Sequence, residues 1–519
     1  MIAKFKIFCW VSLVVFLGLV VWNVACPAFQ AESKNLVIAV PSLPLSLDPA
    51  AEPDLASAGP LSSVFDNLTA FDSNGKIEPA LAESWKNSPD HLVWTFKLRS
   101  GVYFHDGTVF NAQAVVLWID YLRYNSRYQA GRAPGYNFFT ANFAGKQPLL
   151  VKVVALNEHE VQFTLRRPLA NFLELLSAPA MAVTAPSGVA MTDSGRPSFR
   201  PIGTGPFQLN EWRPGQRLVL SAFPSCWRDV PRLNQVIFVV LEDPALRLRE
   251  LERGNIDLAM TVPVSDIDRL KHNPGLKLIN TSSLAKIALV VNCSVRPFND
   301  IRGRIALAAG LPKKQLLHQL CLNRGVVGNS VLSPRSWAYV NNLKQIEYEP
   351  QRARRLLGRL YGSDHRGERE LSLIYPRGSS VWADTEKLAT FLNIHLKDAG
   401  FKVKLKPADP AEYYRFLTGR HGDLILQLES VPKLDPALEL SLIRSNYHNG
   451  RISCLLEAAR FNIDVASRQA CYSDIQDKFN DSAVNCSLVW TSTVHAYRHS
   501  LQGVRTNHWG FLCLEKIYY

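Results

Sequence analysis

The amino-acid sequence predicts an α/β fold, because strand-like and helix-like patterns alternate along most of the chain. Segments 94–98 and 161–165 alternate apolar and polar residues, which is typical of half-buried strands. Segment 236–241 is apolar throughout, which predicts a central strand that is buried on both faces. This alternation argues against an all-helical protein and against an all-strand sandwich.

The second half of the chain contains a complete strand–helix–strand unit. Strand 371–375 precedes a helix that begins at the capping residue Asp384 and ends at Gly400, and strand 402–406 follows. A second helix is predicted over 466–482, and a strand over 488–497 comes after it. No internal repeat is visible in the sequence.

The bulk composition is that of an ordered globular protein. The chain has 519 residues, of which 47% are hydrophobic and 20% are charged, which suits two to four domain-sized units with a sizeable core. The formal net charge is +13, but Lys and Arg are dispersed, and no basic stripe interleaved with aromatic residues occurs. We therefore expect a basic protein surface and no nucleic-acid partner.

The N-terminus has the order of a secretory signal, with two lysines before the apolar stretch 7–22. We expect a signal peptide over 1–31 that is cleaved after Ala31, which leaves a soluble product outside the cytoplasm. Two alternatives stay open. Residues around Cys26 are similar to a lipoprotein box, and the apolar stretch is a possible membrane anchor, although it is short for a span of about 20 residues.

The cysteines and histidines indicate no metal site. The nine cysteines form no CxxC pair and no zinc spacing, and the seven beyond the signal leave at least one thiol unpaired in a monomer. Disulfide pairing of the others stays open, since an exported protein can form disulfides. His495 and His499 lie in or beside a predicted strand, where residues four apart are separated by about 13 Å. That spacing prevents them from sharing one ion, so we expect no metal and no cofactor.

Two motifs invite a catalytic interpretation, which we reject. The sequence HDG at 105–107, followed by Thr108, is a turn signal, and no nucleophile motif accompanies it. The sequence GTG at 203–205 is too short for a phosphate-binding loop and lacks its lysine. We expect a crossover between lobes there, and no catalytic residue anywhere in the chain.

A series of short motifs follows one another in a fixed order from about residue 36 onward. They are LSLDP at 45–49, FDNL at 65–68, GKIEP at 75–79, LAESW at 81–85, WTFKLR at 94–99, VYFHDGT at 102–108, GTGPF at 203–207 and RPF at 296–298. In this order they resemble the extracytoplasmic solute-binding proteins of family 5, which serve peptide, nickel and opine ABC transporters. The shared order is far more specific than any single motif.

This resemblance implies a two-lobed periplasmic binding protein fold of type II, cluster C, with an extra inserted domain in the first lobe. We expect lobe I to comprise 36–65, 200–288 and 490–519, the inserted domain 66–199, and lobe II 289–489. Such a protein is not an enzyme. It closes by a hinge around an oligopeptide or peptide-like solute and delivers it to ABC transporter permease subunits in the inner membrane.

The resemblance further implies a periplasmic monomer, lipid-anchored or membrane-anchored if the signal is not simply cleaved. Two alternatives to peptide transport remain. One is an orphan solute sensor that works without a permease, and the other is a binder of a non-peptide solute such as an opine, a sugar conjugate or a metal chelate.

Peptide binders of this family imply two charged contacts for the ligand. Their arginine after the strand near 371–375 meets the ligand carboxylate, and Arg377 stands close to that position, where a guanidinium fork suits a carboxylate. Their Trp-x-x-Asp stretch before an Asp-Pro pair holds the ligand ammonium. Here Glu429 and Pro432 replace its two key residues, while Asp435 of the Asp-Pro pair remains. We expect Glu429 or Asp435 to substitute, or a different solute to bind.

The remaining candidates for ligand binding lie on loops of both lobes. Ser42 and Leu43 occupy a lobe I loop that commonly lines the cleft, and Asn449 and Arg451 lie where the family places polar residues facing it. Trp382 and Tyr447 are expected to stack on a ligand, with a core position as the alternative for either aromatic ring. For Arg377 the alternative is a solvated loop charge.

Overall fold

The computed structural model describes residues 34–50, 59–72, 74–124, 148–191, 197–362, 368–377, 384–419, 422–431, 435–441, 447, 449–484 and 486–519. The expected signal peptide, Cys26 and Trp382 lie outside these residues. Within the described ranges, no helix combines the length and the apolar character needed to cross a membrane.

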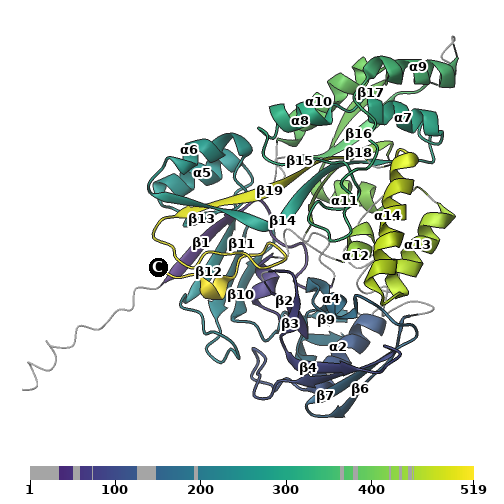
Figure 1. The fold of residues 1–519 in the computed structure, drawn as a ribbon. Coiled ribbons are helices and arrows are strands. Elements are labelled where there is room, and N and C mark those ends of the chain that lie inside the picture. Colours follow the sequence, from purple (N-terminus) through teal and green to yellow (C-terminus); the bar gives the residue numbers. More distant parts are fainter. Residues whose placement is uncertain are drawn as a thin grey trace, which may run out of the picture.

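One large mixed sheet of eleven strands runs through both lobes (Figure 1). In its first half, β1 pairs in parallel with β12 and β13, and β11 joins β12 to β10. We call this half, with α5 and α6, lobe I. Its elements are β1 (Asn35–Val40), β10 (Phe207–Arg213), β11 (Arg217–Ala222), β12 (Gln235–Val240), β13 (Leu258–Ala259), α5 (Pro244–Arg253) and α6 (Ile267–Lys271). The predicted central strand at 236–241 is confirmed as β12, but the expectation that both of its faces are buried is wrong, because buried and half-buried residues alternate along it.

The second half of the sheet, with its surrounding helices, is called lobe II. Here β16 pairs in parallel with β17 and β18, which confirms the predicted strand–helix–strand unit. The elements are β16 (Leu371–Pro376), β17 (Val403–Ala408), β18 (Leu424–Val431), α7 (Ile301–Ala309), α8 (Lys313–Gln319), α9 (Pro350–Tyr361), α10 (Thr385–Asp398), α11 (Pro410–Gly419), α12 (Pro436–Ser441), α13 (Gly450–Phe461) and α14 (Val465–Asp481).

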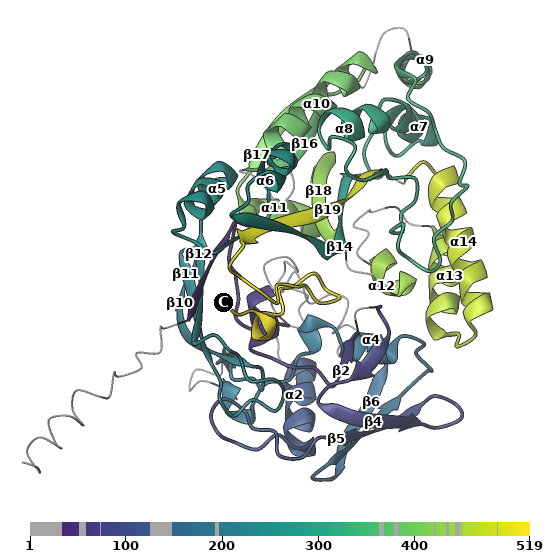
Figure 2. The same cartoon turned by 60° about the vertical axis from the view of Figure 1, so that its left-hand side comes forward.

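Two long antiparallel strands, β14 (Leu276–Val291) and β19 (Ser487–Arg498), cross from one lobe to the other (Figure 2). Short β15 (Val326–Val327) pairs with β19. Because β13 and β14 both run antiparallel to β19, β1 and β12 run toward lobe II. Strands β16 and β18 run antiparallel to β14, toward lobe I. The carboxyl ends of the parallel strands in the two lobes therefore face each other.

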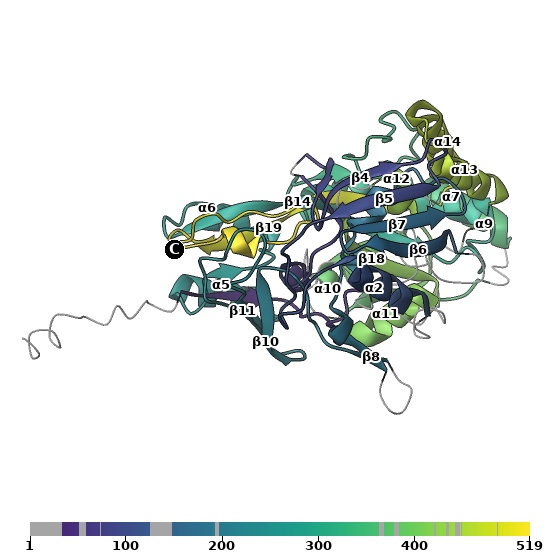
Figure 3. The same ribbon diagram turned by 90° about the horizontal axis from the view of Figure 1, so that it is seen from below.

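A separate four-stranded antiparallel sheet has the order β4-β5-β7-β6 and lies in the chain between β1 and β10. We call it, with α2 and α4, the small sheet unit; it forms a layer of its own when seen from below (Figure 3). Its core is rich in aromatic rings, among them Phe96, Phe163 and Phe172. Its elements are β4 (Ala82–Asn87), β5 (Val93–Leu98), β6 (Leu150–Asn157), β7 (Glu160–Leu165), α2 (Ala112–Tyr124) and α4 (Phe172–Leu176). The predicted strands 94–98 and 161–165 are thus confirmed.

Short elements complete the described chain. Two small hairpins pair β2 with β3 and β8 with β9. These short strands and the 3₁₀ turns are β2 (Thr69–Phe71), β3 (Ile77–Pro79), β8 (Val189–Met191), β9 (Pro197–Phe199), η1 (Gly59–Ser63), η2 (Pro179–Met181), η3 (Pro186–Gly188), η4 (Val264–Asp266) and η5 (Leu514–Lys516).

Local sequence signals behave as predicted where they can be compared. The Asp384 carboxylate caps α10 by accepting a hydrogen bond from the backbone N–H of Lys387 at 3.1 Å. The 105–107 segment is a turn, because Asp106 accepts from the backbone N–H of Thr108 at 3.0 Å and Gly107 has a φ of 82°. All seven cysteines from Cys226 onward are free thiols in this structure.

Candidate functional site

A cavity of about 920 Å³ lies between the lobes, and we call it the interlobe cavity. Its lobe I wall is formed by the segments that follow β12 and β13, which include Asp243 and Thr261. Its lobe II wall is formed by the end of β16, by Arg377 and by the start of α10. Ligands of open α/β sheets bind beyond the carboxyl ends of the strands, and this volume suits a small molecule. The interlobe cavity is therefore our candidate ligand site.

The lobe I wall is held by Arg247 of α5, whose guanidinium is buried. Nε donates to the carbonyl of Met260 at 3.1 Å, and Nη1 donates to the carbonyls of Leu241 at 2.5 Å and Glu242 at 2.9 Å. Nη2 donates to the carbonyl and the hydroxyl of Thr261 at 3.3 and 3.2 Å. Burial lowers the pKa of Arg247 to about 10. All of its donors are used, so Arg247 fixes the two loops rather than offering hydrogen bonds to a ligand.

Arg377 supplies an exposed cation of the lobe II wall. Its backbone N–H donates to the carbonyl of Ala408 at 2.7 Å, which fixes the residue at the end of β16. Its Nε lies 3.2 Å from the carboxylate of Asp409, and the two side chains are 66% and 72% exposed. Such an exposed pair contributes little stability, so a ligand carboxylate can replace Asp409. The structure thus places Arg377 in the lining of the cavity, while its contact with a ligand stays a prediction.

Three acidic side chains of the cavity rim have partners within the protein. Asp384 lies 2.9 Å from Nζ of Lys387, and Asp266 lies 3.0 Å from Nη2 of Arg269. Asp243 caps α5 by accepting from the backbone N–H of Ala245 at 3.0 Å. These carboxylates therefore shape the helix ends that form the rim.

The two predicted contacts from the loop after β1 are placed differently. Leu43 is 4% exposed and packs in the lobe I core with Leu36 and Phe207. Ser42 is exposed, and neither residue is among those that line the interlobe cavity. Their use for a ligand stays a prediction.

Asp435, one of the two candidates for a ligand ammonium group, is bound by other groups of the protein, and its use for a ligand stays a prediction. It is 3% exposed, and its carboxylate forms an ion pair with buried Arg468. Its Oδ1 also accepts from the backbone N–H of Ala437 at 3.0 Å and from the hydroxyl of Tyr472 at 3.3 Å. Asp435 therefore caps α12 and ties it to α14.

Three further candidates lie together at the start of α13, outside the lining of the interlobe cavity. The Asn449 side chain accepts from the backbone N–H of Arg451 at 3.0 Å and donates to the Tyr447 hydroxyl at 3.2 Å. That hydroxyl donates to Oγ of Ser482 at 2.8 Å, and Arg451 lies 3.2 Å from Asp474. The three side chains thus join α13 to α14, and their use for a ligand stays a prediction.

For Glu429 the structure gives only the backbone position, which pairs with Lys286 of β14 as part of β18.

The sequence analysis missed the lobe I wall, although strand 236–241 was predicted and Glu242 follows it directly at the carboxyl end. Arg247 gave no signal, because a charged helix residue is normally exposed.

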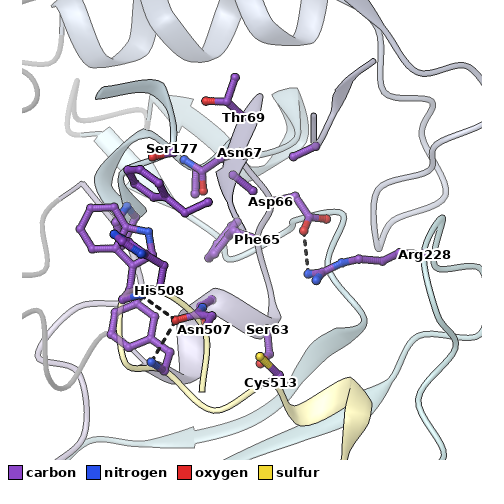
Figure 4. Close-up of a pocket in the computed structure, with 18 of the residues that line it drawn as sticks. Ser63, Phe65, Asp66, Asn67, Thr69, Ser177, Arg228, Asn507, His508 and Cys513 are labelled. Carbon is purple, nitrogen blue, oxygen red and sulfur yellow. Dashed lines mark hydrogen bonds and ion pairs between the residues drawn. The ribbon is translucent and has the colours of Figure 1, made fainter. Parts of the chain in front are cut away.

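A second cavity, of about 530 Å³, lies where the small sheet unit, lobe I and the C-terminal segment meet (Figure 4). Asp66 in its wall lies 2.7 Å from Nη2 of Arg228 and accepts from Thr204 at 2.8 Å and Trp227 at 2.9 Å. The Asp66 carboxylate is therefore already bound by three other side chains of the protein. We interpret this cavity as a structural junction.

Comparisons with known sequences agree with the family resemblance. A family model described as bacterial extracellular solute-binding proteins, family 5 Middle, matches residues 76–450. Di/tripeptide-binding protein 2 of Pseudomonas aeruginosa is 25% identical over 506 residues, covering 93% of this chain and 94% of that protein. Glutathione-binding protein GsiB of Shigella dysenteriae serotype 1 is 28% identical over 513 residues, covering 94% of each.

A solved structure shows the same arrangement of lobes. The dipeptide binding protein from Pseudoalteromonas sp. SM9913, in complex with Met-Leu, matches with a TM-score of 0.84 at 20% identity. The match covers 93% of this chain and 99% of that one. The predicted α/β fold of a periplasmic binding protein is therefore confirmed, while the inserted domain in the first lobe stays a prediction.

Proposed function

Because this chain belongs to the bacterial extracellular solute-binding proteins of family 5, we propose that it is the periplasmic substrate-binding component of an ABC transporter for short peptides or peptide-like solutes. The observation that carries this proposal is the interlobe cavity, where the carboxyl ends of strands from both lobes meet. The relatives support the choice of ligand, since two of them are a di/tripeptide-binding and a glutathione-binding protein.

The geometry suggests how such a ligand is held. Arg377 faces the cavity from lobe II and offers a planar pair of donors to a carboxylate. The loops fixed by Arg247 supply the opposite wall from lobe I. A ligand that touches both walls favours the closed arrangement of the lobes, because only that arrangement provides both sets of contacts. The crossing strands β14 and β19 are the natural hinge.

The sequence departure at 429–432 narrows the ligand class. An ordinary peptide ammonium needs a carboxylate partner when it is desolvated, and the expected aspartate is replaced by Pro432. In a γ-glutamyl peptide such as glutathione, the ammonium group lies beside the carboxylate of its own residue. Such a ligand depends less on a protein carboxylate, so we favour modified peptides of this kind over simple dipeptides.

The proposal is tested by native mass spectrometry of the purified mature protein, followed by calorimetric titration with dipeptides, tripeptides and glutathione. We expect a bound small molecule that is released chemically unchanged, and binding of at least one of these peptides. Recovery of a cleaved or otherwise modified ligand would contradict a pure binding role. Binding of an opine or a metal chelate in place of every peptide would contradict the peptide assignment.

A further inference from the structure

The small sheet unit touches lobe II at a contact that does not involve the crossing strands, where α4 and the residues before it meet the start of α12 and the end of α13 (Figures 1 and 2). Glu174 of α4 accepts a hydrogen bond from the backbone N–H of Asp435 at 3.0 Å. Asn171, just before α4, donates from Nδ2 to Oδ1 of Asp435 at 3.5 Å. Asn171 and Asp435 are 4% and 3% exposed, so this contact excludes water.

The edge of the same contact is more exposed. The backbone N–H of Ala170 donates to the carbonyl of Arg460 at 3.3 Å, and Arg167 lies 3.5 Å from Glu457. The Arg167 guanidinium also lies 3.8 Å from the ring centroid of Phe461, which packs against the core of the small sheet unit. Segment 167–174 therefore makes a continuous contact with lobe II.

Two carboxyl groups at this contact, those of Glu174 and Asp435, lie near a single guanidinium, that of Arg468. Asp435 already forms an ion pair with Arg468. The Tyr472 hydroxyl donates a hydrogen bond to the same aspartate. Burial first, and then the neighbouring Asp435 carboxylate, raise the pKa of Glu174 to about 8; the Asp435 N–H and Arg468 oppose this only in part. Near neutral pH, Glu174 is therefore mostly protonated while the contact is made.

We propose that Glu174 and Asn171 with Asp435 form a proton-dependent latch that holds the small sheet unit against lobe II when the lobes close around a ligand. This inference rests on the binding role proposed above and adds a regulation to it. We take the small sheet unit to move with lobe I, because its core includes Trp509 and Phe511 of the C-terminal segment. Opening of the lobes then breaks the two hydrogen bonds to Asp435, which join the small sheet unit to lobe II. The latch therefore adds to the free energy that favours the closed arrangement, independently of the ligand.

The direction of the pH effect follows from the two states of Glu174. When the lobes separate, its carboxyl returns to water and to an ordinary pKa of 4.5. Between pH 4.5 and about pH 8, the latched state then binds more protons than the open state. The ratio of closed to open protein falls by up to about tenfold for each pH unit in that interval and levels off above it. Ligand affinity falls in parallel, since the ligand needs the closed arrangement.

The test compares the wild-type protein with Glu174→Gln and with the matched control Glu347→Gln. Glutamine keeps the oxygen that accepts from Asp435 but does not titrate, whereas Glu347 is 71% exposed and pairs with Lys314 at the surface. Glutathione or a tripeptide is titrated calorimetrically near pH 6.5 and near pH 8.5. The amino group of the peptide titrates in this range for all three proteins, so differences among them report on Glu174.

We expect the dissociation constant of the wild type and of Glu347→Gln to rise by roughly tenfold or more across this range. For Glu174→Gln we expect the dissociation constant to rise by a factor at least threefold smaller than that of the wild type. Equal pH dependence in all three proteins would overturn the latch while leaving the binding role intact. Asn171→Ala provides a second variant, for which we expect weaker binding near pH 6.5 with the pH dependence retained; unchanged affinity would also count against the latch.

Small-angle scattering of the ligand-free proteins separates this inference from the binding role itself. We expect the wild type to become more extended near pH 8.5 than near pH 6.5, and Glu174→Gln to change less. If no peptide binds to any variant but this difference appears, the proposed ligand is wrong and the latch stands. If the scattering is the same at both pH values, the latch is wrong.

Discussion

The backbone N–H of Thr261 donates to Nδ1 of His495 at 3.1 Å, which joins the loop after β13 to the crossing strand β19. His495 is 1% exposed, and its Nδ1 must be unprotonated to accept this bond. Thr261 also accepts two hydrogen bonds from Arg247, so one residue links the crossing strand β19 to the lobe I wall of the interlobe cavity. This contact between β19 and the lobe I wall therefore depends on a neutral His495.

We predict that the protein loses stability in mild acid through His495. Burial lowers the pKa of this imidazole from 6.5 to about 4. Between these values the unfolded chain binds more protons, so the stability from neutral His495 is present above pH 6.5 and is lost as the pH falls through about 4. The shift corresponds to a loss of about 3 kcal/mol.

Denaturant unfolding near pH 7 and near pH 4.5 measures this loss. The variant His495→Asn keeps an acceptor for Thr261 but does not titrate, so we expect a smaller decrease in its free energy of unfolding. The exposed neighbour His499, changed to Asn, serves as the control and should behave as the wild type. An equal decrease for His495→Asn and the wild type would show that other groups cause the acid sensitivity.

Arg377 and Asp409 give a second prediction, because they form an exposed pair that a ligand carboxylate can open. We expect Arg377→Ala to weaken binding of a peptide with a free carboxylate by about tenfold to a hundredfold, the value of a charge-assisted hydrogen bond. Asp409→Asn removes the competitor, so we expect equal or tighter binding. Calorimetric titration provides the measurement, with a C-terminally amidated peptide as the control ligand. Unchanged affinity of Arg377→Ala would remove Arg377 from the site.

A third prediction concerns Asp435, whose buried partner is Arg468. Removing one partner of a buried ion pair leaves the other charge uncompensated, so Asp435→Ala is expected to cost about 3–5 kcal/mol of unfolding free energy. The exposed Arg451, changed to Ala, is the control, and we expect a change within about 0.5 kcal/mol. Chemical denaturation measures both. A stable Asp435→Ala protein that has lost only ligand affinity would instead favour the ligand-binding interpretation.

The sequence predicts those parts of the fold that depend on neighbouring residues. The helix α10 is an example, because the cap at Asp384, the apolar face and Gly400 all lie within one segment. Strand β12 was recognisable for the same reason, since a short run of apolar residues has few other uses in a soluble protein. Both elements lie within about one residue of their predicted bounds.

The candidate site was harder to predict, because the role of a side chain depends on distant partners. Asp435 is bound by Arg468, which lies 33 residues away, and it meets Glu174 of the small sheet unit 261 residues away. No local sequence pattern predicts either contact. The position of Arg377 at the end of β16 could be predicted because strand ends are local features, while its contact with a ligand stays a prediction.

The last prediction concerns the segment 203–205, through which the chain leaves the β8–β9 hairpin for β10. The backbone N–H of Gly205 donates to the carbonyl of Val64 at 3.0 Å, so two backbones lie in direct contact. A Cβ at Gly203 would meet that carbonyl oxygen at 2.0 Å, and one at Gly205 would meet the carbonyl of Ser63 at 2.5 Å. Neither contact can be relieved by turning a side chain.

We therefore expect Gly203→Ala to lower the free energy of unfolding by about 1–3 kcal/mol or more, measured by denaturant titration. Gly358 of α9 is the matched control, because a Cβ there meets nothing within 4 Å. Since alanine favours a helix over glycine, Gly358→Ala should raise stability by about 0.5–1 kcal/mol. Opposite signs for the two changes would tie the effect to the backbone contact between segments 63–65 and 203–205. A Gly203→Ala protein as stable as the wild type would mean that segments 63–65 and 203–205 do not pack as closely as this structure shows.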